Sequence, residues 1–181
     1  MFHLGHITKR KDLMQIFEEL ELKGKIIGAI SPFNVDNRLS NAAFFVPDPW
    51  TFSEKAYPSF LNYFLDLPRY YSKNYLSPSI LKLFFKGIKF LILLLNPLIF
   101  NDLISSLLRS VLFILRNGIS NSSFFVLYDL ISVSTFVSLK KKYDTSLNII
   151  FLNSLAHNQH HHWDDKHESK KIVSCLKILN Y

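Results

Sequence analysis

Apolar residues near the start of the chain recur at the spacing of an α-helix and then give way to short continuous runs. The helical positions are Leu13, Ile16, Phe17 and Leu20. With Gly24 as its terminator, this pattern predicts a helix over residues 9–22. The apolar run at 25–30 predicts a short buried strand, and residues 43–46 predict another. A helix, a glycine turn and a buried strand in this order are typical of a parallel α/β sheet.

Between residues 57 and 142 the pattern changes to longer segments rich in Leu, Ile and Phe and separated by prolines. The predicted helices cover residues 59–66, 79–95, 101–116 and 123–141. Ser77 followed by Pro78 predicts the start of the second helix, because serine caps helices and proline suits their first turn. Apolar residues occupy these helices nearly all round. They predict a helical insertion that packs on itself and against the sheet, and an exposed surface for a partner or a membrane is the alternative.

A third strand and a final helix follow the insertion. Residues 147–152 form an apolar run that predicts a buried interior strand, and the apolar spacing further on predicts a helix over residues 164–179. The predicted fold is α/β, with a partial parallel sheet, flanking helices and a large helical insertion. Residues 1–56 and 143–181 are expected to form one core, and residues 57–142 the insertion or cap.

Composition excludes a disordered chain and narrows the class of partner. The 181 residues are 49% apolar and 15% aromatic, which is too hydrophobic for disorder. The net charge of +7 comes from lysines at the flanks of the predicted helices, such as Lys140, Lys141 and Lys142. Solvated helix ends explain this charge and no nucleic-acid motif accompanies it, so nucleic acid is not expected as a partner.

The apolar stretches of the chain predict where in the cell it is found. The first residues have no apolar core of the kind found in signal peptides, so a cytoplasmic location is expected. The most apolar stretch, residues 90–100, is interrupted by Asn96 and Pro97 and is too short to span a bilayer. Peripheral contact with a membrane surface stays open. The single cysteine, Cys175, lies in an apolar run and is expected to be a buried small residue.

Four of the seven histidines lie within six residues after the third predicted strand: His157, His160, His161 and His162. Neutral imidazole is the commonest protein ligand of zinc and similar metals. Asn153 stands at the carboxyl end of the strand, and a helical turn would place it on one face with His157 and with His160 or His161. We therefore expect these residues to form a metal site. The alternative is a surface loop that carries several histidines.

Residues 153–163 follow the pattern N-x-x-A-H-x-Q-H-x-x-W, which resembles the alkaline phosphatase superfamily and, more narrowly, its type I phosphodiesterase/nucleotide pyrophosphatase branch. In that branch an Asp at the end of a strand and a His four residues later bind a metal. Asn153 and His157 have this spacing, with Asn in place of the Asp. Residues 13–30 and 44–48 resemble the segment that follows the nucleophile of such enzymes. The resemblance covers about the first 55 and the last 40 residues.

The resemblance implies a metal-dependent hydrolase of phosphate or sulfate esters, with zinc as the expected metal. His157 and Asn153 would hold the metal, and His160 and His161 would be further ligands or substrate contacts. The family's Thr or Ser nucleophile and its Asp-His-Gly pair are not found, so no catalytic residue is assigned. The chain is expected to be an internal fragment of the catalytic domain and inactive alone. A non-enzymatic helical interaction module, or a membrane-associated one, is the alternative.

Overall fold

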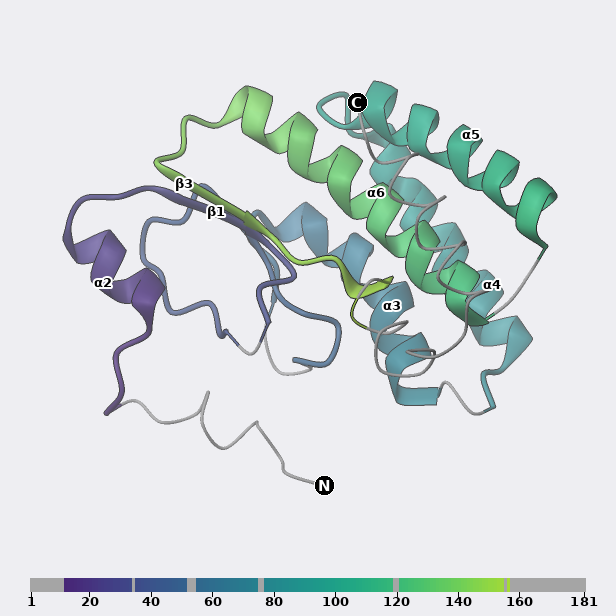
Figure 1. The fold of residues 1–181 in the computed structure, drawn as a ribbon, viewed down its shortest axis with the longest axis horizontal. Helices are drawn as coiled ribbons and strands as arrows, with labels where there is room; N and C mark the ends of the chain where they lie inside the picture. Colours follow the sequence, from purple (N-terminus) through teal and green to yellow (C-terminus); the bar gives the residue numbers. More distant parts are fainter. Residues whose placement is uncertain are drawn as a thin grey trace.

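The computed structural model describes residues 12–33, 35–51, 55–74, 77–118, 121–154 and 156. In chain order the elements are α2 (Ile16–Leu22), β1 (Ile27–Ile30), β2 (Phe44–Val46), the 3-10 helix η1 (Ser59–Leu61), α3 (Asn62–Asn74), α4 (Ile80–Leu91), the 3-10 helix η2 (Ile92–Leu95), α5 (Phe100–Asn117), α6 (Asn121–Lys142) and β3 (Leu147–Ile150). Figure 1 shows the sheet and α2 towards one end and α3 to α5 towards the other, with α6 running beside both.

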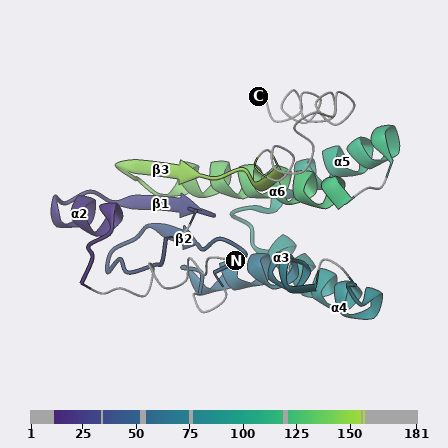
Figure 2. The ribbon, with the colours of Figure 1, turned by 60° about the horizontal axis from the view of Figure 1, so that its bottom comes forward.

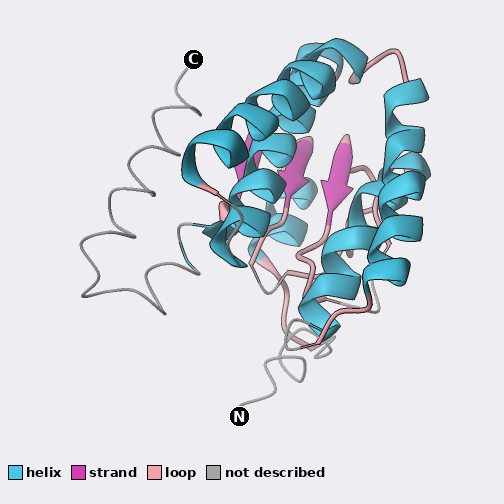
Figure 3. Cartoon of the chain, turned by 90° about the vertical axis from the view of Figure 1, so that its right-hand side faces the viewer, coloured by secondary structure: helices cyan, strands magenta, loops and turns pink. Residues whose placement is uncertain are grey.

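The three strands form one parallel sheet in the order β2-β1-β3. Gly28 is the register partner of Phe44 on one side and of Asn148 on the other. Parallel neighbours need long crossover connections, and α3 to α6 all lie between β2 and β3 in the chain. Figure 3 shows the three strands framed by helices. The predicted fold class, a partial parallel α/β sheet with flanking helices and a large helical insertion, is confirmed.

Alternate residues of the strands point to opposite faces of the sheet, and each face has its own core. The first core joins the sheet to α3, α4, η2, α5 and α6, and its strand members are Ile30, Phe44 and Val46. The second core joins the other face to α2, and its buried members are Phe17, Ile27, Ala29 and Phe45. Figure 2 shows α6 running along β3, with α3 and α4 on the β2 side. Helices therefore cover both faces, as in other parallel sheets.

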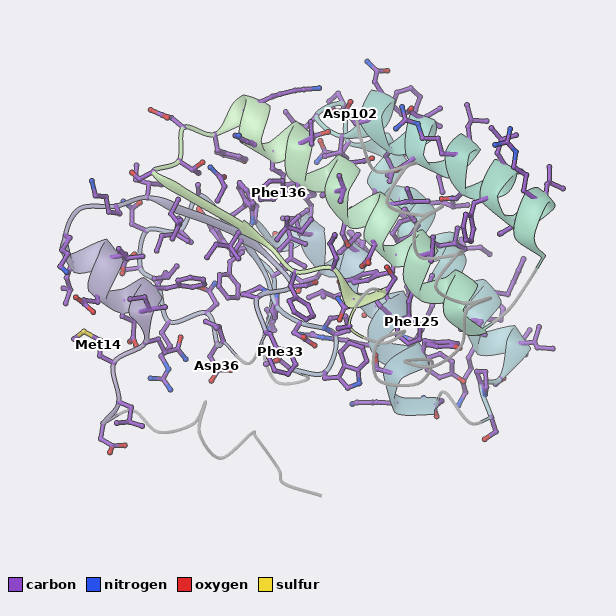
Figure 4. The ribbon with its side chains drawn as sticks, in the orientation of Figure 1. Met14, Phe33, Asp36, Asp102, Phe125 and Phe136 are labelled. Atoms are coloured by element: carbon purple, nitrogen blue, oxygen red, sulfur yellow. The ribbon has the colours of Figure 1, made fainter. Side chains whose placement is uncertain are left out.

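Gly28 is required at the centre of the sheet by the ring of Phe44. A Cβ atom placed on Gly28 would lie 2.4 Å from Cζ of Phe44. That ring is fully buried and meets the ring of Phe136 edge-on, with centroids 6.0 Å apart. Phe136 projects from α6 towards the sheet (Figure 4). The missing side chain lets a large aromatic ring pack directly on the backbone of β1.

The first two predicted strands are confirmed, and the first helix begins later than predicted. Gly24 ends it with φ of 71°, as expected. Its start is set by a capping box, in which the backbone N–H of Gln15 donates to the carboxylate of Glu18 at 2.7 Å. Of the predicted core positions, Phe17 is buried, whereas Leu13 precedes the helix and is exposed.

All four helices predicted in the insertion are present, with two errors at their boundaries. The first was predicted to end at residue 66 but continues through Pro68 to Asn74. Pro68 is buried, and this tertiary packing offsets the hydrogen bond that proline removes from the helix. α4 begins after Ser79 rather than after Ser77, and the Ser79 N–H donates instead to the hydroxyl of Tyr70 at 3.0 Å.

The third strand forms, but it is not interior. Within the described ranges β3 pairs with β1 alone and lies at the edge of the sheet, and all four of its residues are half-buried. The prediction of a buried interior strand over residues 147–152 is therefore wrong, because burial depends on neighbours that an apolar pattern does not report. The predicted helix over residues 164–179, with Cys175, lies outside the described residues. In the part that is described, every helix is too short or too polar to cross a membrane.

Candidate functional site

The parallel strands bring polar residues to one edge of the sheet, where their carboxyl ends meet. Ser31 directly follows β1, Asp48 comes two residues after β2, and Asn153 comes three residues after β3. All three side chains are buried. Figure 4 labels Phe33 and Phe125, which lie near this edge. Open α/β sheets bind their ligands at this edge, so these residues define the candidate site.

Ser31 adopts a backbone conformation that is rare for a residue other than glycine. Its φ is 53°, in the left-handed region. Its N–H donates to the carbonyl oxygen of Val46 at 2.7 Å, and its Oγ lies 2.8 Å from the hydroxyl of Tyr128 in α6. Burial raises the pKa of the Tyr128 hydroxyl well above its usual value, and the charges of Asp48 and Asp129 raise it further. Tyr128 therefore stays protonated and ties the end of β1 to α6.

Asp129, the next residue of α6, holds the chain where it leaves β3. Its Oδ1 accepts a hydrogen bond from the backbone N–H of Asn153 at 2.9 Å, and its Oδ2 accepts one from the backbone N–H of Ser154 at 2.8 Å. The Ser154 hydroxyl donates to Oδ2 as well. Burial raises the pKa of Asp129 to about 6, while these three donors act in the opposite direction. Both carboxylate oxygens are thus committed to fixing this turn, so Asp129 acts as an anchor.

Asn153 is the one predicted metal ligand that lies within the described residues. Its side chain is 4% exposed, and its Nδ2 has no hydrogen-bond partner in that part of the chain. A buried polar atom without a partner costs free energy, which is why such atoms are rare in native proteins. Asp129 therefore holds the backbone of Asn153 at the carboxyl edge of the sheet, while the NH2 group of the side chain, a hydrogen-bond donor, has no partner among the described residues. Asn153 follows the third strand, as predicted, but β3 ends at Ile150 and is not interior.

Asp48 is a second buried group with an uncommitted atom. It is 2% exposed, its Oδ1 accepts the backbone N–H of Trp50 at 2.7 Å, and its Oδ2 has no partner among the residues described. Burial raises the pKa of Asp48 to about 6, and the Trp50 N–H and the charge of Arg69 act in the opposite direction. The Arg69 guanidinium donates to the carbonyl oxygen of Thr51 at 2.6 Å. The loop after β2 thus brings a carboxylate and a guanidinium into electrostatic range of each other.

Exposed aromatic rings border these buried polar groups. The ring of Phe33 stacks on that of Phe151, with centroids 5.5 Å apart, and the ring of Trp50 stacks on that of Phe125 at 6.3 Å. Phe33 and Trp50 are both exposed. The edge therefore combines buried groups that hydrogen-bond with flat apolar surfaces at its rim, a combination common in sites for small molecules.

A metal site is not complete within the described part of the chain. No three His, Cys, Asp or Glu side chains there converge as a metal site would require. Asp129 accepts three hydrogen bonds, whereas two other buried atoms at this edge have no partner among the described residues: Oδ2 of Asp48, which could face a cation, and Nδ2 of Asn153, which can only donate a hydrogen bond. His157, His160 and His161 lie outside the described residues.

Comparison of the chain with protein-family models, with curated proteins and with solved structures gives no match.

Sequence reasoning missed the residues that organise this edge. Asp129 is the only charged residue between positions 124 and 139, and an acid inside so apolar a helix is a signal that it has a partner. Asp48 follows a predicted strand closely, which is the signal that could have found it, but the sequence alone assigned it no role. Tyr128 left no signal of its own, because its role depends on a contact with Ser31, which lies 97 positions away in the chain.

Proposed function

We propose that this chain carries one side of the active site of a metal-dependent hydrolase that acts on phosphate or sulfate esters. In this proposal Asn153 and His157 hold a divalent metal, zinc being the expected one, and His160 and His161 are further ligands or substrate contacts. The proposal rests on one observation: Asn153 is buried at the carboxyl edge of the sheet, where Asp129 holds its backbone N–H, four residues before His157.

The anchoring by Asp129 supports this role for Asn153. Two consecutive backbone N–H groups, of Asn153 and Ser154, donate to one buried carboxylate, which fixes where the chain turns away from β3. Ligands that are held in place before the metal arrives bind it more tightly, because less conformational freedom is lost on binding. A residue restrained in this way is a suitable first ligand for a site that the following histidines would complete.

The chemistry of such a site requires groups beyond those assigned. A bound divalent metal would supply a Lewis acid that stabilises the charge on the transferred group. No nucleophile has been assigned in this chain, and no second ligand set of the Asp-His-Gly kind is found in it. We therefore propose that the chain by itself hydrolyses esters slowly or not at all, and that its own contribution is to bind and orient.

Zinc titration by calorimetry tests the metal assignment. We expect wild type to release heat on binding zinc, His157→Ala to lose most of that heat, and Asn153→Ala to bind more weakly. His3→Ala is the matched control, since His3 lies outside the histidine segment, and it should bind zinc as wild type does. Circular dichroism confirms that each variant keeps its helices. Equal heats for wild type and His157→Ala would refute the assignment.

The second candidate is a non-enzymatic module, and a separate observation favours it. The outward side of α4 carries many exposed large apolar side chains, a feature typical of interaction surfaces. Absence of a zinc-binding difference between wild type and His157→Ala would favour this candidate. In either case the cytoplasmic location remains a prediction, which fractionation of cells that express the chain would test.

A further inference from the structure

A continuous stripe of exposed apolar side chains runs along α4 and η2. Its members are Ile80, Leu81, Phe84, Phe85, Ile88, Leu91, Ile92 and Leu95. Ile80 and Leu95, at its two ends, are 84% and 80% exposed. The residues recur at intervals of three and four, so they lie on one side of the helix. Soluble monomers seldom expose so large an apolar surface without a use for it.

The opposite side of the same helix is what holds it to the protein. Phe90 is buried and its ring lies 6.2 Å from that of Phe64 in α3, and Leu93 of η2 is buried in the same core. The stripe therefore points outward from a helix that is already packed on its other side. Its exposure is a feature of the folded insertion, so the stripe is available to a partner outside the core.

The charges beside the stripe are positive. α4 carries Lys82, Lys86 and Lys89 and no acidic residue. Asp66 of α3 is the acidic partner of Lys86 and Lys89, at 3.8 and 4.0 Å. Three lysines against one carboxylate leave an excess of two positive charges next to the apolar surface. Apolar side chains flanked by lysines characterise helices that lie in the interface of an anionic bilayer.

We propose that α4 and η2 seat this protein on the surface of a membrane that contains anionic lipids. The helix lies parallel to the membrane plane, with Phe84 and Phe85 at the boundary between headgroups and acyl chains. Lys82 and Lys89 contact the anionic headgroups. This inference does not rest on the hydrolase proposal, because none of these residues belongs to the candidate site.

Charge decides between a bilayer and a second copy of this chain. A symmetric dimer through the stripe would bring two lysine-bearing helices together, so like charges would oppose it, whereas anionic lipid attracts the same lysines. The membrane is therefore the occupant that satisfies both the apolar and the charged features of α4.

Flotation of the full chain with lipid vesicles tests the proposal. Vesicles of equal parts phosphatidylglycerol and phosphatidylcholine should bind the wild type, and vesicles of phosphatidylcholine alone should bind it much more weakly. The double variant Phe84→Glu, Phe85→Glu should lose roughly tenfold or more of its partition into anionic vesicles. Lys82→Gln and Lys89→Gln should each lose roughly fivefold and should make binding less sensitive to salt.

Two controls decide what a loss of binding means. All substituted positions are exposed. Circular dichroism should therefore show that each variant folds as wild type does. Leu108→Glu changes an exposed apolar residue of α5 instead, and it should bind vesicles as wild type does. Equal binding by wild type and the Phe84/Phe85 variant, or an equal loss in Leu108→Glu, overturns the proposal. So does a dimer in solution that the Phe84/Phe85 variant abolishes, because the stripe would then belong to a second copy.

Discussion

The carboxylate of Asp129 in α6 accepts hydrogen bonds from both the backbone N–H and the hydroxyl of Ser154, which comes 25 residues later in the chain. With the N–H of Asn153 as a third donor, this contact ties the longest helix of the insertion to the point where the chain leaves the sheet. The insertion and the candidate site are therefore coupled. A substitution or movement in α6 should change the position of Asn153 and Ser154 at the edge of the sheet.

Removal of this anchor should destabilise the fold. Asp129→Ala leaves three buried donors without an acceptor, and we expect it to lower the free energy of unfolding by roughly 3 kcal/mol. Ser154→Ala removes one of those donors and should cost about 1 kcal/mol. Urea denaturation followed by circular dichroism measures both. Asp144→Ala, at an exposed position, is the control and should change stability by less than about 0.5 kcal/mol.

A double-mutant cycle on Asp129 and Ser154 separates this contact from other effects. If the two side chains act through each other, the double variant should lose about 1 kcal/mol less than the two single losses added together. Additive losses would mean that Asp129 stabilises the protein by some other route.

Stability should depend on pH through Asp48. Burial raises its pKa from 3.8 to about 6, so the folded state binds the proton more tightly than the unfolded state does. The stabilising contribution of the protonated carboxyl is complete below about pH 4 and is lost as the pH rises through 6, a change on the order of 3 kcal/mol. Relative to wild type, Asp48→Asn should therefore show a smaller fall in stability between pH 4 and pH 7. Urea denaturation at a series of pH values measures this.

Asp144→Asn serves as the control for the pH experiment, since it makes the same substitution at an exposed aspartate. If Asp48→Asn follows the wild-type curve, Asp48 is not the source of the slope. Asp129, whose pKa burial also raises to about 6, would then be the next group to test by the same measurement.

Two glycine substitutions should have opposite effects. Gly28→Ala places a methyl group against the buried ring of Phe44, and we expect it to cost about 1–3 kcal/mol. Gly87→Ala in α4 meets nothing within 4 Å and should stabilise the helix by about 0.5–1 kcal/mol. Thermal unfolding of both variants measures the difference in sign. A neutral Gly28→Ala would show that the ring does not pack on β1 as described.

Catalysis by the isolated chain should be absent. With zinc added, hydrolysis of bis(4-nitrophenyl) phosphate by wild type should not exceed that by His157→Ala, because no nucleophile is assigned in the chain. Robust metal-dependent turnover that His157→Ala abolishes would contradict this and would show that the chain holds a complete site.

Local sequence patterns predicted the helices and strands. Contacts between residues distant in sequence determine which strand lies at the edge of the sheet and where some helices end. The strands at 27–30 and 44–46 and the helices of the insertion follow from short-range spacing of apolar residues. The edge position of β3 does not, because it depends on which strand lies beside it. Pro68 is a similar case, since its burial against other elements allows a helix that local propensity would end.

The place of Asn153 after the third strand was predicted from the sequence, and its role as a metal ligand stays a prediction. Asn153 lies at the carboxyl edge because parallel strands end there, which the order of elements already indicated. Its anchor, Asp129, could not be assigned because the partners stand 24 and 25 residues apart with no repeating pattern to relate them. An acidic residue in an otherwise apolar helix predicts that a hydrogen-bond partner exists, but it does not indicate which residue that partner is.

The most direct test of the proposed metal site is nuclear magnetic resonance on chain labelled with ¹⁵N. Zinc is added stepwise while the side-chain amide of Asn153 and the imidazole of His157 are observed, with Asn153→Ala and His157→Ala assigning the signals. We predict that both signals shift together and stop shifting once zinc equals the protein in amount. An Asn153 amide that stays unchanged while the histidines shift would contradict the proposal that these two residues hold one metal.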